Sequence, residues 1–356
     1  MKKVYLKWGA AALLIAAVLV FLIFHGSFAG REKSAEKDAF RLGTFVRIRL
    51  YGDDEHFLSS ALASGDAEIV RLEGLLSANL PGSDISRINN AGGKFVKVER
   101  ETAEVVSRAV DICKKSGGAF DPTLGALSSL WRIGTESARV PSRSEAEAAA
   151  ATHDIDKVSV EKRTDGWYVK CGEGQRLDLG AIAKGYIGGM LHDYFKKIGV
   201  KRGIIDLGGN ITAIGGGISG EPWHFGIQHP KKKRGEYFGV VSAPEDYSVV
   251  TSGPYERFFE SGGRRYHHIF DPKTGFPAES DLASVSIAER DPALADALCT
   301  ALFVMGSEKA LCFLSENNNI AAVLVTNDNN VIVTPAASAL FRLTDNDFRL
   351  SDSGEK

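Results

Sequence analysis

Residues 291–306, with the sequence DPALADALCTALFVMG, form the most informative segment of the chain. An aspartate followed by proline suits a helix N-terminus, and the final glycine suits a helix end. Between these ends only Asp296 and Thr300 carry strongly polar side chains. Because a helix that is apolar all round is buried, the segment predicts a core helix over 292–305.

Asp296 and Thr300 are four residues apart, so they share one face of this helix. A buried carboxylate must be paired or must bind a cation. A carboxylate beside a hydroxyl offers oxygen ligands only, which suits Mg²⁺ or Ca²⁺ rather than zinc. The helix alone leaves a second interpretation open, in which Asp296 pairs with a buried arginine or lysine.

The composition limits the class of protein. The chain has 356 residues, 43 Lys plus Arg, 45 Asp plus Glu and 44% hydrophobic residues. A net charge of −2 argues against nucleic acid as a partner, and this composition argues against wholesale disorder. The four cysteines show no CxxC pairing, which excludes a disulfide-dense scaffold and a cysteine zinc site.

Around the central segment, short strands alternate with helices. The periodicity predicts helices over 55–76, 101–115 and about 182–198, and a hairpin over 320–333. Short, hairpin-connected strands favour antiparallel or mixed sheets, so we expect an α+β fold with packed helices.

The first thirty residues carry a targeting pattern, because three lysines precede the uncharged run Trp8–Phe24. This run is long for a signal peptide and short for a span of about 20 residues. Ser27-Phe28-Ala29 fits a cleavage site, so a cleaved signal and an uncleaved anchor both stay open, with a buried core helix as the third alternative. No cysteine lies near residue 30, which excludes a lipid-modified N-terminal cysteine.

These patterns divide the chain into four parts. We expect a signal peptide or membrane anchor over 1–30, a charged linker over 31–39, one body over 40–345 and a polar tail over 346–356.

Residues 177–186, LDLGAIAKGY, predict a strand end, a glycine turn and a helix start that carries Lys184. Free N–H groups and a lysine at such a helix start favour phosphate binding. The segment is neither a Walker loop nor a GxGxxG fingerprint. Taken alone, it is a weak signal.

His268 opens the segment HIFDPKTG, in which an imidazole and a carboxylate lie beside a Pro/Gly turn. A histidine there can take a proton from a hydroxyl. A hydrolase triad of Ser252, His268 and an aspartate is an alternative, although no GxSxG elbow supports it.

Together and in this order, the motifs resemble the ApbE family, the FAD:protein FMN transferases. The matching blocks cover about residues 40–335. They are Gly43-Thr44, Ser83-Asp84-Ile85-Ser86-Arg87-Ile88-Asn89, Gly118-Ala119-Phe120-Asp121-Pro122-Thr123, residues 178–186, Gly208-Gly209-Asn210, Thr251-Ser252-Gly253, residues 268–275, and Ala295-Asp296-Ala297-Leu298-Cys299-Thr300.

The resemblance implies a T-fold-like α+β body that binds FAD and a divalent cation, usually Mg²⁺. Such enzymes move FMN from FAD onto a Ser or Thr hydroxyl of a target protein and release AMP.

The resemblance also implies roles for individual residues. Asp296, Thr300 and the backbone carbonyl of Ala181 would hold the metal. His268 would be the base, and Lys184 would act near the flavin phosphate. The positions that would contact FAD are Ala119, Phe120, Asp121, Asp178, Lys184, Ser252 and His268.

One position departs from the family pattern. Many relatives carry an aromatic residue that stacks on the flavin where this chain has Asn79. Its loss would favour hydrolysis of FAD to FMN and AMP, which is the first alternative function. A flavin-binding carrier without catalysis is the second, and a base at His268 argues against it.

The resemblance implies an acceptor protein, such as a subunit of an Nqr- or Rnf-type redox pump, and no nucleic acid. With the targeting segment, it places the body on the extracytoplasmic face of a bacterial cytoplasmic membrane, anchored there or periplasmic.

Overall fold

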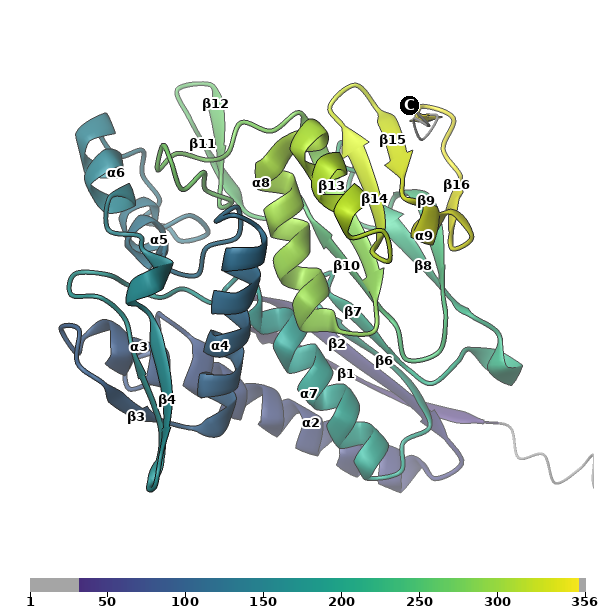
Figure 1. Ribbon diagram of the computed structural model, residues 1–356. Helices are drawn as coiled ribbons and strands as arrows, with labels where there is room; N and C mark the ends of the chain where they lie inside the picture. The colour runs from purple at the N-terminus through teal and green to yellow at the C-terminus, as the bar shows by residue number, and fades with distance from the viewer. Residues whose placement is uncertain (1–31, 352–356) are drawn as a thin grey trace, which may run out of the picture.

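The computed structural model describes residues 32–351, and the expected targeting segment lies outside them (Figure 1). The body is α+β, as predicted, and is built on one nine-stranded sheet. In spatial order its strands are β1 (Lys33–Arg41), β2 (Thr44–Gly52), β6 (Arg202–Leu207), β7 (Ile211–Ile214), β10 (Ser248–Ser252), β13 (Leu282–Glu289), β14 (Ala321–Thr326), β15 (Asn330–Val333) and β17 (Arg349–Leu350). Every neighbouring pair is antiparallel except β15 and β17, which are parallel.

Three smaller sheets complete the strands. They are β16 (Phe341–Leu343), β9 (Tyr237–Ala243) and β8 (Trp223–Gln228); β3 (Val96–Val98), β5 (Gly166–Lys170) and β4 (Ser159–Arg163); and the hairpin of β11 (Phe258–Ser261) and β12 (Arg264–His267).

The helices of the described residues are α2 (Glu55–Leu76), α3 (Asp84–Asn89), α4 (Arg100–Lys115), α5 (Gly125–Trp131), α6 (Arg143–Ala150), α7 (Ala183–Lys197), α8 (Pro292–Glu316) and α9 (Pro335–Ser338). Three long helices, α2, α7 and α8, cover one face of the large sheet. Figure 1 shows α8 and α7 in front of the sheet, with α4 beside them.

The central strands β7, β10, β13 and β14 are buried on both faces, whereas β1 and β2 expose one face. Successive side chains of a strand point to opposite sides, so each central strand contributes to two cores. On β10, Val250 packs with the helices, whereas Val249 packs with the core beneath β8 and β9. On β14, Leu324 and Val325 divide in the same way. The central strands therefore form the middle layer of the molecule.

Helix α8 confirms the expected core helix and its stop. Gly306 has a φ of +74°, which interrupts the helix, and a further helical segment then continues to Glu316. Asp281 accepts a hydrogen bond from Ser307 N at 2.8 Å and so caps this second segment. Although α8 has the length and mean hydropathy (1.6) of a membrane span, its first half is buried inside the body.

The expected linker over 31–39 is wrong, since Lys33–Arg41 forms strand β1. Glu36 and Asp38 lie on the exposed face of this edge strand and pair with arginines of β2. On the other face, Ala35 and Ala39 pack against the core, and the charged Lys37 and Arg41 pair with Asp66 of α2. The alternation of exposed and half-buried residues along 33–41 is the period of a strand.

The polar tail expected over 346–356 is also wrong for its first five residues. Phe348 is buried and stacks on Phe238 with a centroid separation of 4.7 Å. Arg349 and Leu350 then pair with β15. The body therefore extends to residue 350, and residues 352–356 lie outside the described part.

Candidate active site

The N-terminal turns of α7 and α8 touch each other at Gly185. A Cβ atom at Gly185 would lie 2.1 Å from the carbonyl oxygen of Pro292, closer than any side chain can approach. The N–H of Gly185 donates to Asp296 Oδ2 at 2.9 Å. The glycine therefore allows the contact that brings the start of α7 to the carboxylate on α8.

Asp296 is buried, with only 2% of its surface exposed, and it lies beside a lysine. Lys184 Nζ is 3.6 Å from Asp296 Oδ1 and donates to the carbonyl oxygen of Gly180 at 3.4 Å. The lysine pairing left open by the sequence is thus present. The same two oxygens, an anionic one and a carbonyl one, are also the donor types that a hard divalent cation requires.

Thr300 and Ser252 meet one turn further along α8. Their hydroxyl oxygens are 3.5 Å apart, and Thr300 Oγ1 is 3.5 Å from the carbonyl oxygen of Asp296. Ser252 is the last residue of β10, so its hydroxyl is positioned by the sheet beside α8. Asp296, Thr300, Lys184 and Ser252, predicted from separate motifs, therefore gather in one place.

His268 is held by main-chain atoms of Arg257. Its Nδ1 lies 3.1 Å from the carbonyl oxygen of Arg257, and its own N–H donates to that oxygen at 3.2 Å. Because a carbonyl can only accept, Nδ1 carries the proton and Nε2 presents a lone pair. Within residues 32–351, no carboxylate orients this ring, which removes the Ser-His-Asp triad.

Burial lowers the pKa of His268 to about 3, and the positive charges of Arg257 and Lys184 act in the same direction. The imidazole is consequently neutral near pH 7 and able to accept a proton.

The neighbouring His267 is structural. Its Nε2 lies 3.2 Å from the carbonyl oxygen of Ala278, and its Nδ1 accepts from Ile269 N at 3.3 Å. Both ring nitrogens are used, so this histidine has no free lone pair for a substrate.

The side chain of Arg257 binds the turn between β1 and β2, and so links that hairpin to the segment that holds His268. Its guanidinium donates to the carbonyl oxygens of Leu42 (3.0 Å) and Gly43 (3.3 Å). Next to this turn, Thr44 packs against Gly208, where a Cβ would lie 2.4 Å from Thr44 Oγ1. The Gly-Thr and Gly-Gly-Asn motifs are thereby joined to the site.

Asp121 and Asp178 lie on two segments that run side by side. Leu124 and Arg176 form a parallel bridge, and Asp178 N donates to the carbonyl oxygen of Pro122 at 2.8 Å. Each aspartate also caps its own turn, since Asp121 Oδ1 accepts from Thr123 N at 2.7 Å and Asp178 Oδ1 accepts from Gly180 N at 2.8 Å.

Sequence reasoning assigned no role to Asn89, which holds the segment before Asp178. The strand end predicted there is wrong, since only Arg176 forms an isolated bridge. The side chain of Asn89 accepts from Leu177 N at 2.6 Å and donates to Leu177 O at 2.9 Å. This paired contact fixes the backbone that leads into the 178–186 turn. Asn89 ends the 83–89 motif, but its partner Leu177 is distant in sequence, so no local pattern could identify the contact.

A cavity of about 900 Å³ opens between the Asp121 turn and α8. Ala119, Asp121, Asp271, Val304 and Met305 help to line it. Val304 follows Thr300 at the same four-residue spacing that separates Thr300 from Asp296, so all three share one face of α8. The cavity thus continues the face that carries the proposed metal ligands.

Phe120 differs from the expectation for a ring that contacts FAD. The whole residue is 2% exposed and packs in the main core, and its N–H donates to Ser116 Oγ at 3.2 Å. Phe120 therefore offers almost no surface to a ligand in this structure.

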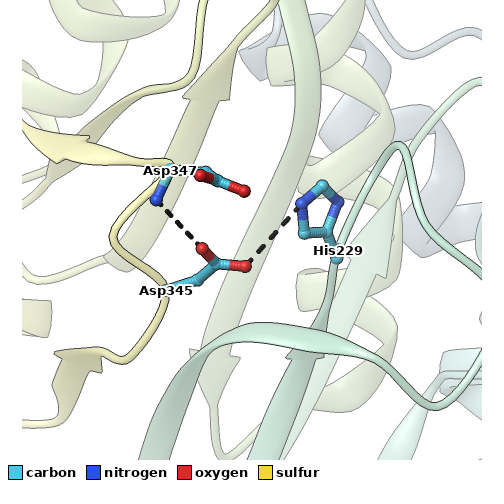
Figure 2. A group of neighbouring side chains, drawn as sticks. All are labelled: His229, Asp345 and Asp347. Atoms are coloured by element: carbon cyan, nitrogen blue, oxygen red, sulfur yellow. Dashed lines mark hydrogen bonds and ion pairs between the residues drawn. The ribbon is translucent and has the colours of Figure 1, made fainter.

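A second group of ligand-type side chains lies far along the sheet, at His229, Asp345 and Asp347 (Figure 2). The Asp345 carboxylate lies between the ring of His229, 3.9 Å away, and the N–H of Asp347. Lys232 Nζ binds Asp345 at 2.9 Å, and His229 Nδ1 accepts from Lys231 N. These contacts explain the group as a fastening of the C-terminal strand to the hairpin of β8 and β9.

The family model named "ApbE family" matches residues 42–324. The chain belongs to the ApbE family. Among curated relatives, a "FAD:protein FMN transferase" of Treponema pallidum is 37% identical over 89% of this chain and 92% of its own. One of Klebsiella pneumoniae with the same name is 33% identical over 87% and 95%.

Solved ApbE structures share the fold. The ApbE protein of Thermotoga maritima superposes with a TM-score of 0.79 at 30% identity, over 87% of this chain and all of that one. The flavin transferase ApbE of Vibrio cholerae gives 0.76 at 26% identity, with the same coverages. This ApbE chain therefore covers the full length of both solved structures.

Proposed function

We propose that this ApbE protein transfers FMN from FAD to a serine or threonine hydroxyl of an acceptor protein, with release of AMP and with Mg²⁺ as the metal. The observation that carries the proposal is the presence of two features in one chain. His268 is neutral and its Nε2 is free to accept a proton, and the buried carboxylate of Asp296 offers oxygen ligands to a cation. The names of the curated relatives support the same activity.

The donor set around Asp296 fits a divalent cation. The buried carboxylate has only one N–H donor, Gly185, and one cation, Lys184, as partners within residues 32–351. Asp296, Thr300 and the carbonyl of Ala181 would hold the metal. When bound there, Mg²⁺ would neutralise the pyrophosphate and stabilise the oxygen that leaves with AMP.

His268 would act on the acceptor hydroxyl. Its Nε2 would take the hydroxyl proton while the oxygen attacks the phosphorus on the FMN side of the pyrophosphate. The bond from that phosphorus to the bridging oxygen breaks, and AMP leaves with the bonding electrons. Lys184 would balance charge on the flavin phosphate.

The remaining predicted residues would bind FAD. Ala119 and Asp121 line the cavity, which supports a place for part of the dinucleotide there, with the buried Phe120 shaping the turn between them. Asp178 lies on the adjoining segment, and Ser252 lies beside Thr300.

Hydrolysis of FAD to FMN and AMP is a second candidate, favoured by one observation. Asn79 is exposed and supplies no aromatic ring at the position where the family carries one. Water could then replace the acceptor hydroxyl at the same base. A non-catalytic carrier is disfavoured, because a carrier has no use for a free imidazole nitrogen.

We further propose an extracytoplasmic acceptor, such as a redox-pump subunit of the Nqr or Rnf type. The lysine-flanked apolar run before residue 30 supports export or anchoring. The described body begins almost directly after it, with β1 at Lys33.

The test uses the full chain in mild detergent with FAD, MgCl₂ and a threonine-bearing domain of a redox-pump subunit. We expect the acceptor to gain the mass of FMN less water, and we expect EDTA to prevent this gain. Free FMN and AMP with an unmodified acceptor would instead establish the hydrolase. Intact FAD and an unmodified acceptor would contradict both.

A further inference from the structure

The ammonium of Lys184 occupies a position surrounded by oxygen. It lies 3.6 Å from Asp296 Oδ1 and 3.4 Å from the carbonyl oxygen of Gly180. The side chain of Asp296 is 3% exposed and that of Lys184 is 24% exposed. A side chain with a single positive charge therefore lies beside a buried carboxylate.

This position has a physical cause. A buried carboxylate is costly without a counter-charge. Within the described residues the other polar partner of this carboxylate is the neutral N–H of Gly185. Lys184 thus supplies the positive charge that balances Asp296.

A divalent cation would need the same carboxylate. An ammonium and a metal ion cannot share Asp296 Oδ1 without strong like-charge repulsion at this separation. We propose that Lys184 is the resident counter-cation of Asp296, and that the divalent metal binds by displacing its ammonium. The proposal rests on the metal site of the proposed function.

The local structure permits this exchange without movement of the helices. Gly185 holds the start of α7 against α8 through a contact that has no room for a side chain. Lys184, by contrast, carries its charge on a flexible four-carbon stem. The backbone can therefore stay in place while the ammonium moves.

The displaced ammonium stays within the site. Lys184 lies in the first turn of α7, so its stem keeps the ammonium close to the carboxylate that it leaves. After exchange the ammonium would be free to pair with the anionic pyrophosphate. Before metal binding, Lys184 would balance the charge of Asp296. After metal binding, it would bind the pyrophosphate of the substrate.

The test is calorimetric titration of the metal-depleted full chain, in mild detergent, with MgCl₂ alone. Lys184→Met removes the competing cation, and we expect Mg²⁺ to bind about tenfold more tightly than in the wild type. We also expect Lys184→Met to lower the Tm in EDTA and to show a larger Mg²⁺-induced rise in Tm. Lys197→Met, which changes an exposed lysine of the same helix, should match the wild type in both measurements.

Two further variants keep the test decisive. Lys184→Arg retains the competing charge, so its Mg²⁺ affinity should stay at or below that of the wild type even if Lys184→Met does not fold. Equal or weaker Mg²⁺ binding by folded Lys184→Met, or tighter binding by Lys184→Arg, would overturn the exchange.

Asp296→Asn should remove Mg²⁺ binding. Undiminished binding in Asp296→Asn would remove the metal from this carboxylate and the exchange with it. Because neither FAD nor an acceptor is present, a failure of FMN transfer would leave these titrations unaffected.

Discussion

The Nδ1 atom of His268 lies 3.1 Å from the carbonyl oxygen of Arg257, whose own guanidinium binds the carbonyl oxygens of Leu42 and Gly43. One residue thus orients the imidazole through its main chain and fastens the loop through its side chain. Its positive charge also helps to keep the pKa of His268 low, after the larger effect of burial.

Arg257→Met should change the pH dependence of transfer. Loss of the positive charge raises the pKa of His268, although burial, Lys184 and His267 still lower it. The base is active when neutral, so the acid limb of the kcat/KM profile should move to higher pH. The loosened loop should also reduce kcat/KM by about one to two orders of magnitude.

Arg257→Lys separates these two effects. It keeps the charge but loses the planar guanidinium, so the acid limb should stay near that of the wild type while kcat/KM falls. Arg143→Met, at an exposed arginine of α6, serves as the control. Identical acid limbs in the wild type and Arg257→Met would show that the charge of Arg257 does not tune the base.

His268→Ala should bind FAD but lose transfer by about 10²- to 10⁴-fold, the usual contribution of a general base. FAD binding is measured by flavin fluorescence, and transfer by the mass of the acceptor. The matched variant is His267→Ala, which removes two structural hydrogen bonds and should cost about 1–3 kcal/mol of unfolding free energy. Its folded fraction should still transfer FMN, and near-normal transfer by His268→Ala would remove that residue from the base role.

The sequence was most informative where all the residues of a motif lie in one helix or one turn. Helix α8 could be predicted because its two polar residues stand out in an apolar segment. His268 could be singled out as a candidate base because it lies beside a recognisable Asp-Pro turn.

Contacts between distant segments could not be predicted in this way. Asn89 holds Leu177, and the guanidinium of Arg257 holds the β1–β2 turn, through bonds to main-chain atoms that leave no residue pattern. The strand at 33–41 was missed because an edge strand rich in charged residues has the composition of a linker. Such features depend on which segments the fold places together.

Gly185→Ala should destabilise the body, because the new Cβ would lie 2.1 Å from the carbonyl oxygen of Pro292. The start of α7 must then move away from α8, at a cost of about 1–3 kcal/mol. The same movement should weaken Mg²⁺ binding, since Gly185 N–H also holds Asp296. Urea unfolding and magnesium titration measure the two effects.

Gly189→Ala is the matched control on the same helix. Its Cβ would meet Pro292 Cγ at 3.2 Å, a contact that a few tenths of an ångström relieve. Alanine also favours a helix by about 1 kcal/mol relative to glycine, so this variant should be neutral or slightly stabilised. Equal stability of the Gly185 and Gly189 variants would contradict the close contact between α7 and α8.

Asn79→Tyr should shift the balance between transfer and hydrolysis. Asn79 is exposed, and its N–H donates to Ser77 Oγ at 3.2 Å, so a larger side chain meets no buried neighbour. A tyrosine ring there would offer the flavin a stacking face worth about 0.5–1.5 kcal/mol, which should tighten FAD binding by up to about tenfold.

With FAD held longer, fewer flavin phosphates should be lost to water before an acceptor arrives. The ratio of flavinylated acceptor to free FMN should therefore rise in Asn79→Tyr, as measured by mass spectrometry and chromatography of one reaction. Asn79→Ala, which adds no ring, should keep the wild-type ratio. If Asn79→Tyr binds FAD no better and forms the same products, this loop does not contact the flavin in this chain, and any hydrolysis must have its cause nearer to His268.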